Sequence, residues 1–172
     1  GLAKRGPRRG SFASASTTRS TNIRMGALTD TEFLRTSNLT ATGDDITGSD
    51  DEDGVVMPTM TAGAPVTIPV VVTNTSSSAV YLNAWIDYNN NGVVTDAREK
   101  VASNVAVAAG TNGATQDLTF TASETALTGV NLGVRIILTD AIDAASVGLV
   151  GLGEVEDYIV NILAPTTDFG DN

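Results

Sequence analysis

Apolar residues recur at every second position in several stretches after residue 55, which is the period of a β-strand with one face in a core. Pro69 falls on the opposite face of the first stretch, which predicts an edge strand or a bulge there. The expected inward positions are Val66, Ile68, Val70, Val72, Val80, Leu82, Ala84, Ile86, Leu118, Phe120, Val130, Leu132, Val134, Ile136, Leu138, Tyr158, Val160 and Ile162.

Short clusters of Gly, Asn, Ser and Thr separate these stretches and mark turns. No long run has the period of an amphipathic helix, although residues 121–129 predict one helical turn. Roughly seven or eight short strands joined by regular turns predict an all-β fold, an antiparallel β-sandwich of immunoglobulin-like or jelly-roll type. We expect the sandwich to occupy residues 23–164.

Both ends of the chain differ from this body in composition. Residues 1–22 are basic, small and polar, which predicts an extended arm because Ser and Thr compete for the hydrogen bonds of a helix. Residues 165–172 are expected to form a short C-terminal tail. Up to Arg35 the chain has seven basic residues and two acids, whereas three basic residues and eighteen acids follow it. Such an arm can bind nucleic acid, an anionic surface or the acidic body of another copy.

The 172-residue chain contains no Cys and no His. Disulfides, zinc sites built from Cys and His, haem ligation by His and a Ser-His-Asp triad are therefore excluded, and we expect no enzymatic activity. No apolar run approaches the ~20 residues that span a bilayer, so membrane insertion is not expected. The acidic body and the lack of a basic, aromatic stripe argue against nucleic acid as a partner.

The composition also bears on location. The chain begins with Gly, as either a shortened chain or a mature product without its leader would, and Ser, Thr, Ala, Val, Gly and Asn abound. We expect the mature product of a secreted protein, located outside the cell or on its surface. Asn38 and Asn74 begin tripeptides that fit the glycosylation acceptor pattern, but such tripeptides are common by chance in Thr-rich sequence.

One acidic loop, residues 87–99, has the oxygen donors of a cation site. Alternate Asp and Asn side chains followed by Gly92 let a chain curl around a hard cation, and a later acid closes the cage. The sequence predicts a structural calcium site with Asp87, Asn89, Asn91, the Val93 carbonyl, Asp96 and Glu99 as ligands. The loop departs from the helix-loop-helix pattern because position twelve is Arg98, and a polar hairpin with an Asn-Gly turn is the alternative.

A second set of acids lies in two further segments, residues 43–55 and 151–160. Like charges at the start of a strand are tolerable when a cation or an Arg neutralises them, or when solvent screens them. The residues concerned are Asp51, Asp53, Glu154, Glu156 and Asp157, which form a second, less certain candidate for calcium.

Three of these motifs, in order, resemble the GEVED domain family: "ATGDDITGSDDEDGV", "AWIDYNNNGVV" with its later acid, and "GEVEDY". The resemblance runs from about Ile23 to the C-terminus. It implies a β-sandwich module of large secreted and cell-surface bacterial proteins, often present in tandem copies. The family often has further acids where this chain has Asn90, Asn91 and Thr95.

The segment "DFGD", residues 168–171, usually opens a unit in the tandem proteins, but here it follows the sandwich. The resemblance therefore implies that this segment belongs to a following unit, which in a single-domain protein is another subunit. Either this tail or the segment at residues 11–24 is a candidate for exchange, and the longer basic arm is favoured over the tail.

The sequence thus predicts a secreted, non-enzymatic structural protein. We expect it to be the subunit of an extracellular filament or surface assembly, a head-to-tail homopolymer joined by donor-strand-like exchange of a terminal segment. The alternative is a monomeric adhesion or carbohydrate-binding module that binds surface glycans on Tyr81, Trp85 and Tyr88. A glycosidase acting through Glu154 and Glu156 is disfavoured, because both lie on one face of one strand and nothing marks a cleft.

Overall fold

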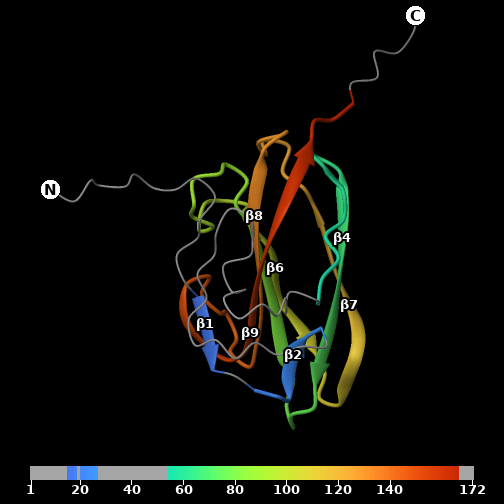
Figure 1. The fold of residues 1–172 in the computed structure, drawn as a ribbon, viewed down its shortest axis with the longest axis vertical. Helices are drawn as coiled ribbons and strands as arrows, with labels where there is room; N and C mark the ends of the chain where they lie inside the picture. Colours follow the sequence, from blue (N-terminus) through green and yellow to red (C-terminus); the bar gives the residue numbers. More distant parts are fainter. Residues whose placement is uncertain (1–14, 19, 27–53, 167–172) are drawn as a thin grey trace, which may run out of the picture.

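The computed structural model describes residues 15–18, 20–26 and 54–166, and all regular structure within them is β (Figure 1). The strands are β1 (Ala15–Thr18), β2 (Ile23–Met25), β3 (Met60–Thr61), β4 (Pro65–Asn74), β5 (Val80–Ile86), β6 (Lys100–Val107), β7 (Thr111–Thr121), β8 (Asn131–Thr139) and β9 (Gly148–Leu163). Most of the predicted arm, the acids Asp51 and Asp53, Asn38 and the "DFGD" tail lie outside the described residues.

The strands form two sheets, so the predicted all-β sandwich is confirmed. One sheet has the order β1-β9-β8-β5-β6, with β3 also paired to β9, and the other has the order β2-β4-β7. Figure 1 shows β4 and β7 standing beside the sheet that contains β8 and β9. β1 and β3 run parallel to β9, whereas the other described pairings are antiparallel. No hairpin links either strand to β9, so no tight turn imposes an antiparallel direction on them.

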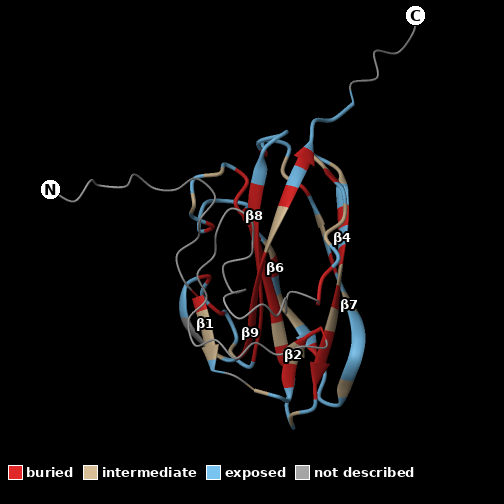
Figure 2. Ribbon diagram, viewed as in Figure 1, coloured by how far each residue is buried: buried red, intermediate tan, exposed pale blue. Residues whose placement is uncertain are grey.

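Alternating apolar residues of β4, β5 and β8 fill the space between the sheets, as the sequence predicts. Figure 2 shows burial concentrated on β8 and β9, while β7 is largely exposed. Phe120 on β7 is only half-buried, and Val130 precedes β8 and is exposed. The predicted edge strand at Pro69 is wrong, because β4 is the middle strand of its sheet. The proline is tolerated because β2 pairs only with Val72, Thr73 and Asn74, so beside Pro69 β4 has only β7 and the bridge between Val55 and Val70.

The outer face of the larger sheet is also buried, which alternation alone does not indicate. A second apolar cluster lies on it and brings together Ala15, Trp85, Val94, Ile137, Ala144 and Val155. Ala15 comes from β1, whereas Val94 and Ala144 come from the loops that follow β5 and β8. These segments cover the centre of the sheet, so β8 is buried on both faces.

Two further local predictions are wrong. Residues 121–129 form no helical turn, because Ser123 Oγ accepts the N–H of Thr125 in a short polar turn instead. The last strand does not begin after the acids but at Gly148, so the acids lie inside β9. β6 was not predicted, since its small and polar residues hide the alternation of an edge strand.

Candidate functional site

The loop that follows β5 is folded around the carboxylate of Asp87. This side chain is fully buried, and its two oxygens accept the backbone N–H groups of Asn91 at 3.1 Å and Gly92 at 2.8 Å. Asn90 and Gly92 have positive φ angles of 55° and 82°, which turn the backbone amides toward the carboxylate. Asp87 therefore organises the turn, as a buried carboxylate that accepts backbone hydrogen bonds.

Asp96 draws the two asparagines of the loop together. Its Oδ2 accepts hydrogen bonds from the side-chain amides of Asn89 at 2.8 Å and Asn91 at 2.6 Å. These hydrogen bonds lower the pKa of Asp96 below its ordinary value. The N–H of Val93 donates to Asn91 Oδ1 at 2.9 Å. The structure thus brings the predicted side-chain ligands of this segment into one loop, which we call the Asp87–Glu99 loop.

Glu99 closes this loop from the inside. One carboxylate oxygen, Oε2, accepts the N–H of Asp96 at 3.2 Å, while Oε1 is buried without a hydrogen-bond partner. The pKa of Glu99 is raised to about 7. Burial is the main cause, and the negative charges of Asp87 and Asp96 contribute as well. Burial also raises the pKa of Asp87. A buried acceptor beside two like charges is the kind of group that a cation satisfies.

The oxygen atoms of this loop are of the type that binds calcium, since carboxylate and amide oxygens are the usual ligands of this ion. As the side chains lie, no group of three acids within the described ranges is close enough to hold a metal ion. Asn89 and Asn91 present their amide nitrogens to Asp96 rather than their oxygens to a common centre. Binding of a cation would therefore require these two side chains to turn, and the assignment to calcium stays a proposal.

Protonation of Glu99 predicts a pH dependence of stability when calcium is absent. The pKa of Glu99 is about 7 in the folded protein and has the ordinary value of 4.5 in the unfolded chain. Between these two pH values Glu99 is therefore protonated in the folded protein and ionised in the unfolded chain. The free energy of unfolding should therefore fall as pH rises across that window. Urea unfolding with a chelator present measures this slope. Glu99→Gln should flatten it, whereas Glu124→Gln at an exposed position should not; equal slopes in the parent and Glu99→Gln would contradict the assignment.

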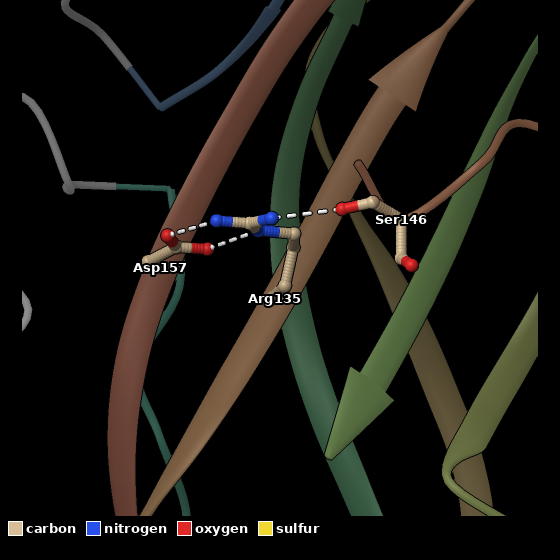
Figure 3. A network of polar contacts seen from close by, with 3 residues as sticks. All are labelled: Arg135, Ser146 and Asp157. Carbon is tan, nitrogen blue, oxygen red and sulfur yellow. Dashed lines mark hydrogen bonds and ion pairs between the residues drawn. The ribbon is translucent and has the colours of Figure 1, made fainter. Parts of the chain in front are cut away.

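The acids of residues 153–158 have separate partners inside the protein. Arg135 lies directly opposite Asp157 in the pairing of β8 with β9. Figure 3 shows the guanidinium between Asp157 and Ser146: Nε and Nη2 donate to the two carboxylate oxygens at 2.8 Å and 2.7 Å, and Nη1 donates to the Ser146 carbonyl at 2.8 Å. Arg135 is completely buried. The group that neutralises Asp157 is thus an arginine, one of the three alternatives that sequence reasoning left open.

Glu154 and Glu156 face the other side of β9. They are in register with Leu138 and Ile136, two residues of the main core, so their side chains point between the sheets. Glu154 accepts the backbone N–H of Met25, and Glu156 accepts the hydroxyl of Tyr158. Because Asp157 points to the outer face, the structure does not bring the three acids of β9 together as one metal site.

The other candidate residues are buried. Trp85 and Tyr88 are 4% and 5% exposed, so they cannot form a sugar platform with Tyr81. Asn74 is also buried, and its side-chain amide donates to the carbonyls of Ser78 at 2.8 Å and Val107 at 3.0 Å. This amide is therefore not available for glycosylation. Within the described part of the chain, no helix is long and apolar enough to span a membrane.

Sequence reasoning missed the role of Arg135. One signal was available: it is the only charged residue within an otherwise apolar alternating stretch, and unpaired charges are rarely buried. Comparison with known proteins agrees with two of the three motifs, since residues 81–161 match the model of the GEVED domain and contain "AWIDYNNNGVV" and "GEVEDY". The motif at residues 41–55 lies outside this match, which is shorter than the resemblance predicted from about Ile23 to the C-terminus. This match contains both the Asp87–Glu99 loop and the Arg135–Asp157 pair. No curated protein matches the chain.

Proposed function

Because residues 81–161 form a GEVED domain, we propose that this protein is a non-enzymatic structural subunit of an extracellular filament or surface assembly. Its subunits are joined by exchange of the N-terminal strand β1. The observation that carries the proposal is the way β1 is attached. It is a separate four-residue strand on the outer edge of β9, far from β9 in sequence and not part of any hairpin.

The described contacts of β1 are with β9 and with the outer apolar cluster. Ala15 is buried in the outer cluster, and Thr17 Oγ1 donates to the Gly153 carbonyl at 2.7 Å. The pairing with β9 is parallel and is interrupted by an irregularity between Ser16 and Thr18. The same strand from a neighbouring copy can make identical contacts, which is the principle of domain swapping and of strand addition.

Charge favours association between copies. The basic residues at the start of the chain precede β1, and the body is strongly acidic beyond Arg35. Attraction between a basic arm and an acidic neighbour steers two copies together, while main-chain hydrogen bonds of the exchanged strand hold them. An assembly held in this way resists salt better than one held by the arm charges alone.

Removal of the arm tests strand exchange. We expect the full chain to assemble, a chain without residues 1–21 to stay monomeric, and a chain without residues 165–172 to assemble, as light scattering and electron microscopy will measure. The point variant Ala15→Asp should stay monomeric like the armless chain, since it places a charge at a buried position of β1. Ala108→Asp is the exposed control and should assemble. A parent that is monomeric at high concentration, or an armless chain that assembles as well as the parent, would refute the exchange.

Calcium in the Asp87–Glu99 loop is proposed as a structural component of the module. Its support is the buried, unpartnered oxygen of Glu99 beside two further carboxylates. A ligand that binds only the folded state stabilises it by about 2.7 kcal/mol at a hundredfold excess over Kd. We expect calcium added after chelation to raise the melting temperature by roughly 5–10 °C.

Variants of the same loop give the control for calcium. Glu99→Gln should abolish the response to calcium while leaving the chelated protein at least as stable at neutral pH, because it removes a buried charge. Glu124→Gln, an exposed acid outside the loop, should respond like the parent. A melting temperature that millimolar calcium leaves unchanged in the parent would show that the loop is a polar hairpin held by its own hydrogen bonds.

A further inference from the structure

The basic residues of the acidic body are distributed unevenly. Only Arg98, Lys100 and Arg135 follow Arg35 in the sequence. Arg135 is buried and bonded to Asp157, so it offers nothing to a ligand. The other two are exposed, make no ion pair within the described residues, and line the same pocket. The accessible cations of the described sandwich beyond Gly54 are therefore gathered at one place.

This pocket lies where the start of β6 meets the end of β7. Its volume is about 460 Å³, and its lining includes Arg98, Lys100, Phe120, Thr121 and Glu124. A pocket of this size is in the range of small-ligand sites, whereas a stable protein interface needs a broader surface. Phe120 gives the pocket a half-buried aromatic ring, and Thr121 gives it an exposed hydroxyl.

The fold constrains Arg98 and Lys100 at different points. Arg98 has a positive backbone φ of 70°, an uncommon conformation for a residue with a side chain, and it directly precedes the buried Glu99. The ammonium of Lys100 lies 5.4 Å from the centre of the Trp85 ring, a cation–π arrangement that limits its freedom. Contact with Trp85 limits the motion of the Lys100 ammonium, so this group loses less entropy when it binds an anion.

We propose that this pocket binds an acidic sugar, a uronic acid unit of an extracellular polysaccharide. Arg98 and Lys100 hold the carboxylate, as guanidinium and ammonium groups do in charge-assisted hydrogen bonds. Phe120 packs against the C–H face of the sugar ring, and Thr121 offers its hydroxyl to a sugar hydroxyl. This site does not depend on strand exchange, and it differs from the platform of Tyr81, Trp85 and Tyr88. Because Arg98 precedes Glu99 in the Asp87–Glu99 loop, binding is measured at constant calcium.

Binding of a short oligogalacturonate to the full chain tests the site, with isothermal titration calorimetry at low salt as the measurement. Arg98→Gln and Lys100→Gln should each weaken binding by about tenfold, the usual effect of losing a hydrogen bond to a charged group. Glu124→Gln should strengthen binding, because it removes from the pocket lining a negative charge that repels the carboxylate of the sugar. Binding should weaken as salt rises. Arg24→Gln removes one positive charge from a residue outside the pocket lining, and this variant should bind the sugar like the parent.

Several results would overturn the proposal. No binding by the parent would do so, as would undiminished binding by Arg98→Gln and Lys100→Gln. Equal weakening in Arg24→Gln would reveal attraction by net charge alone. Equal binding of the methyl-esterified sugar would exclude recognition of the carboxylate, and equal competition by a poly-aspartate peptide would make the site a receptor for acidic peptides. If Lys100→Gln does not fold, Lys100→Arg, which keeps the charge, should fold and bind.

Discussion

Asp157→Ala is expected to lower the free energy of unfolding by about 3–5 kcal/mol, the usual cost of removing one partner of a buried ion pair. The variant removes the carboxylate that accepts hydrogen bonds from Nε and Nη2 of the buried Arg135 guanidinium. The Ser146 carbonyl still accepts one hydrogen bond from Arg135 but cannot neutralise its charge. Urea unfolding of the parent and the variant in one buffer, with calcium held constant, measures the difference.

The matched control replaces both partners. Arg135→Met combined with Asp157→Leu removes the two charges together and keeps apolar volume on the covered outer face. Its stability should lie much closer to that of the parent than that of Asp157→Ala, because a buried pair and a well-packed apolar pair are often nearly equivalent. If Asp157→Ala loses less than about 1 kcal/mol, the pair behaves as a surface ion pair, and burial is not what makes it important.

This pair explains why a strand carries three acids in four residues. Within β9 the acids alternate between faces, so Glu154 and Glu156 meet partners between the sheets while Asp157 meets Arg135 outside. Glu154, Glu156 and Asp157 accept hydrogen bonds from three different groups of the protein. The motif thus ties β9 to β2 and β8 and to its own Tyr158, whereas the Asp87–Glu99 loop is where we propose a cation.

Much of the fold could be predicted from alternation because β4, β5 and β8 have one face in the core. The inward positions of these strands, such as Ile68, Leu82 and Ile136, are fully buried. Alternation could not reveal the second buried face, since its cover comes from β1, which is distant in sequence, and from the irregular loops that follow β5 and β8. Nor could it reveal β6, whose pattern is that of an edge strand with half-exposed small residues.

The candidate site could be predicted in part. Spacing of Asp and Asn is a local property, so the sequence could place Asp87, Asn89, Asn91 and Asp96 in one loop, where they are hydrogen-bonded to one another. Their role as cation ligands stays a prediction. The partners of the β9 acids depend on strand register, which fixes Arg135 opposite Asp157 and cannot be obtained from spacing alone. The pocket with Arg98 and Lys100 depends on the meeting of β6 and β7, strands that belong to different sheets.

Gly153→Ala is expected to be about as damaging as loss of Asp157. Gly153 has a φ of 143°, and a Cβ atom there would stand 1.8 Å from the carbonyl oxygen of Leu138 on β8. The added methyl group must push the two paired strands apart, which costs about 1–3 kcal/mol as overpacking. The backbone conformation costs a further ~1–3 kcal/mol for a residue with a side chain. Thermal and urea unfolding measure the combined loss.

Gly110→Ala separates the two causes. Gly110 also has a positive φ, 86°, but a Cβ atom there would meet nothing within 4 Å. It should therefore lose only about 1 kcal/mol, from conformational strain without a clash. Gly153 also accepts the hydroxyl of Thr17, so its displacement should loosen β1, and hydrogen exchange of the β1 amides should speed up in Gly153→Ala only. Equal stability losses in the two variants would mean that β8 and β9 can move apart at Gly153 without cost, and that the glycine is required for its backbone angle alone.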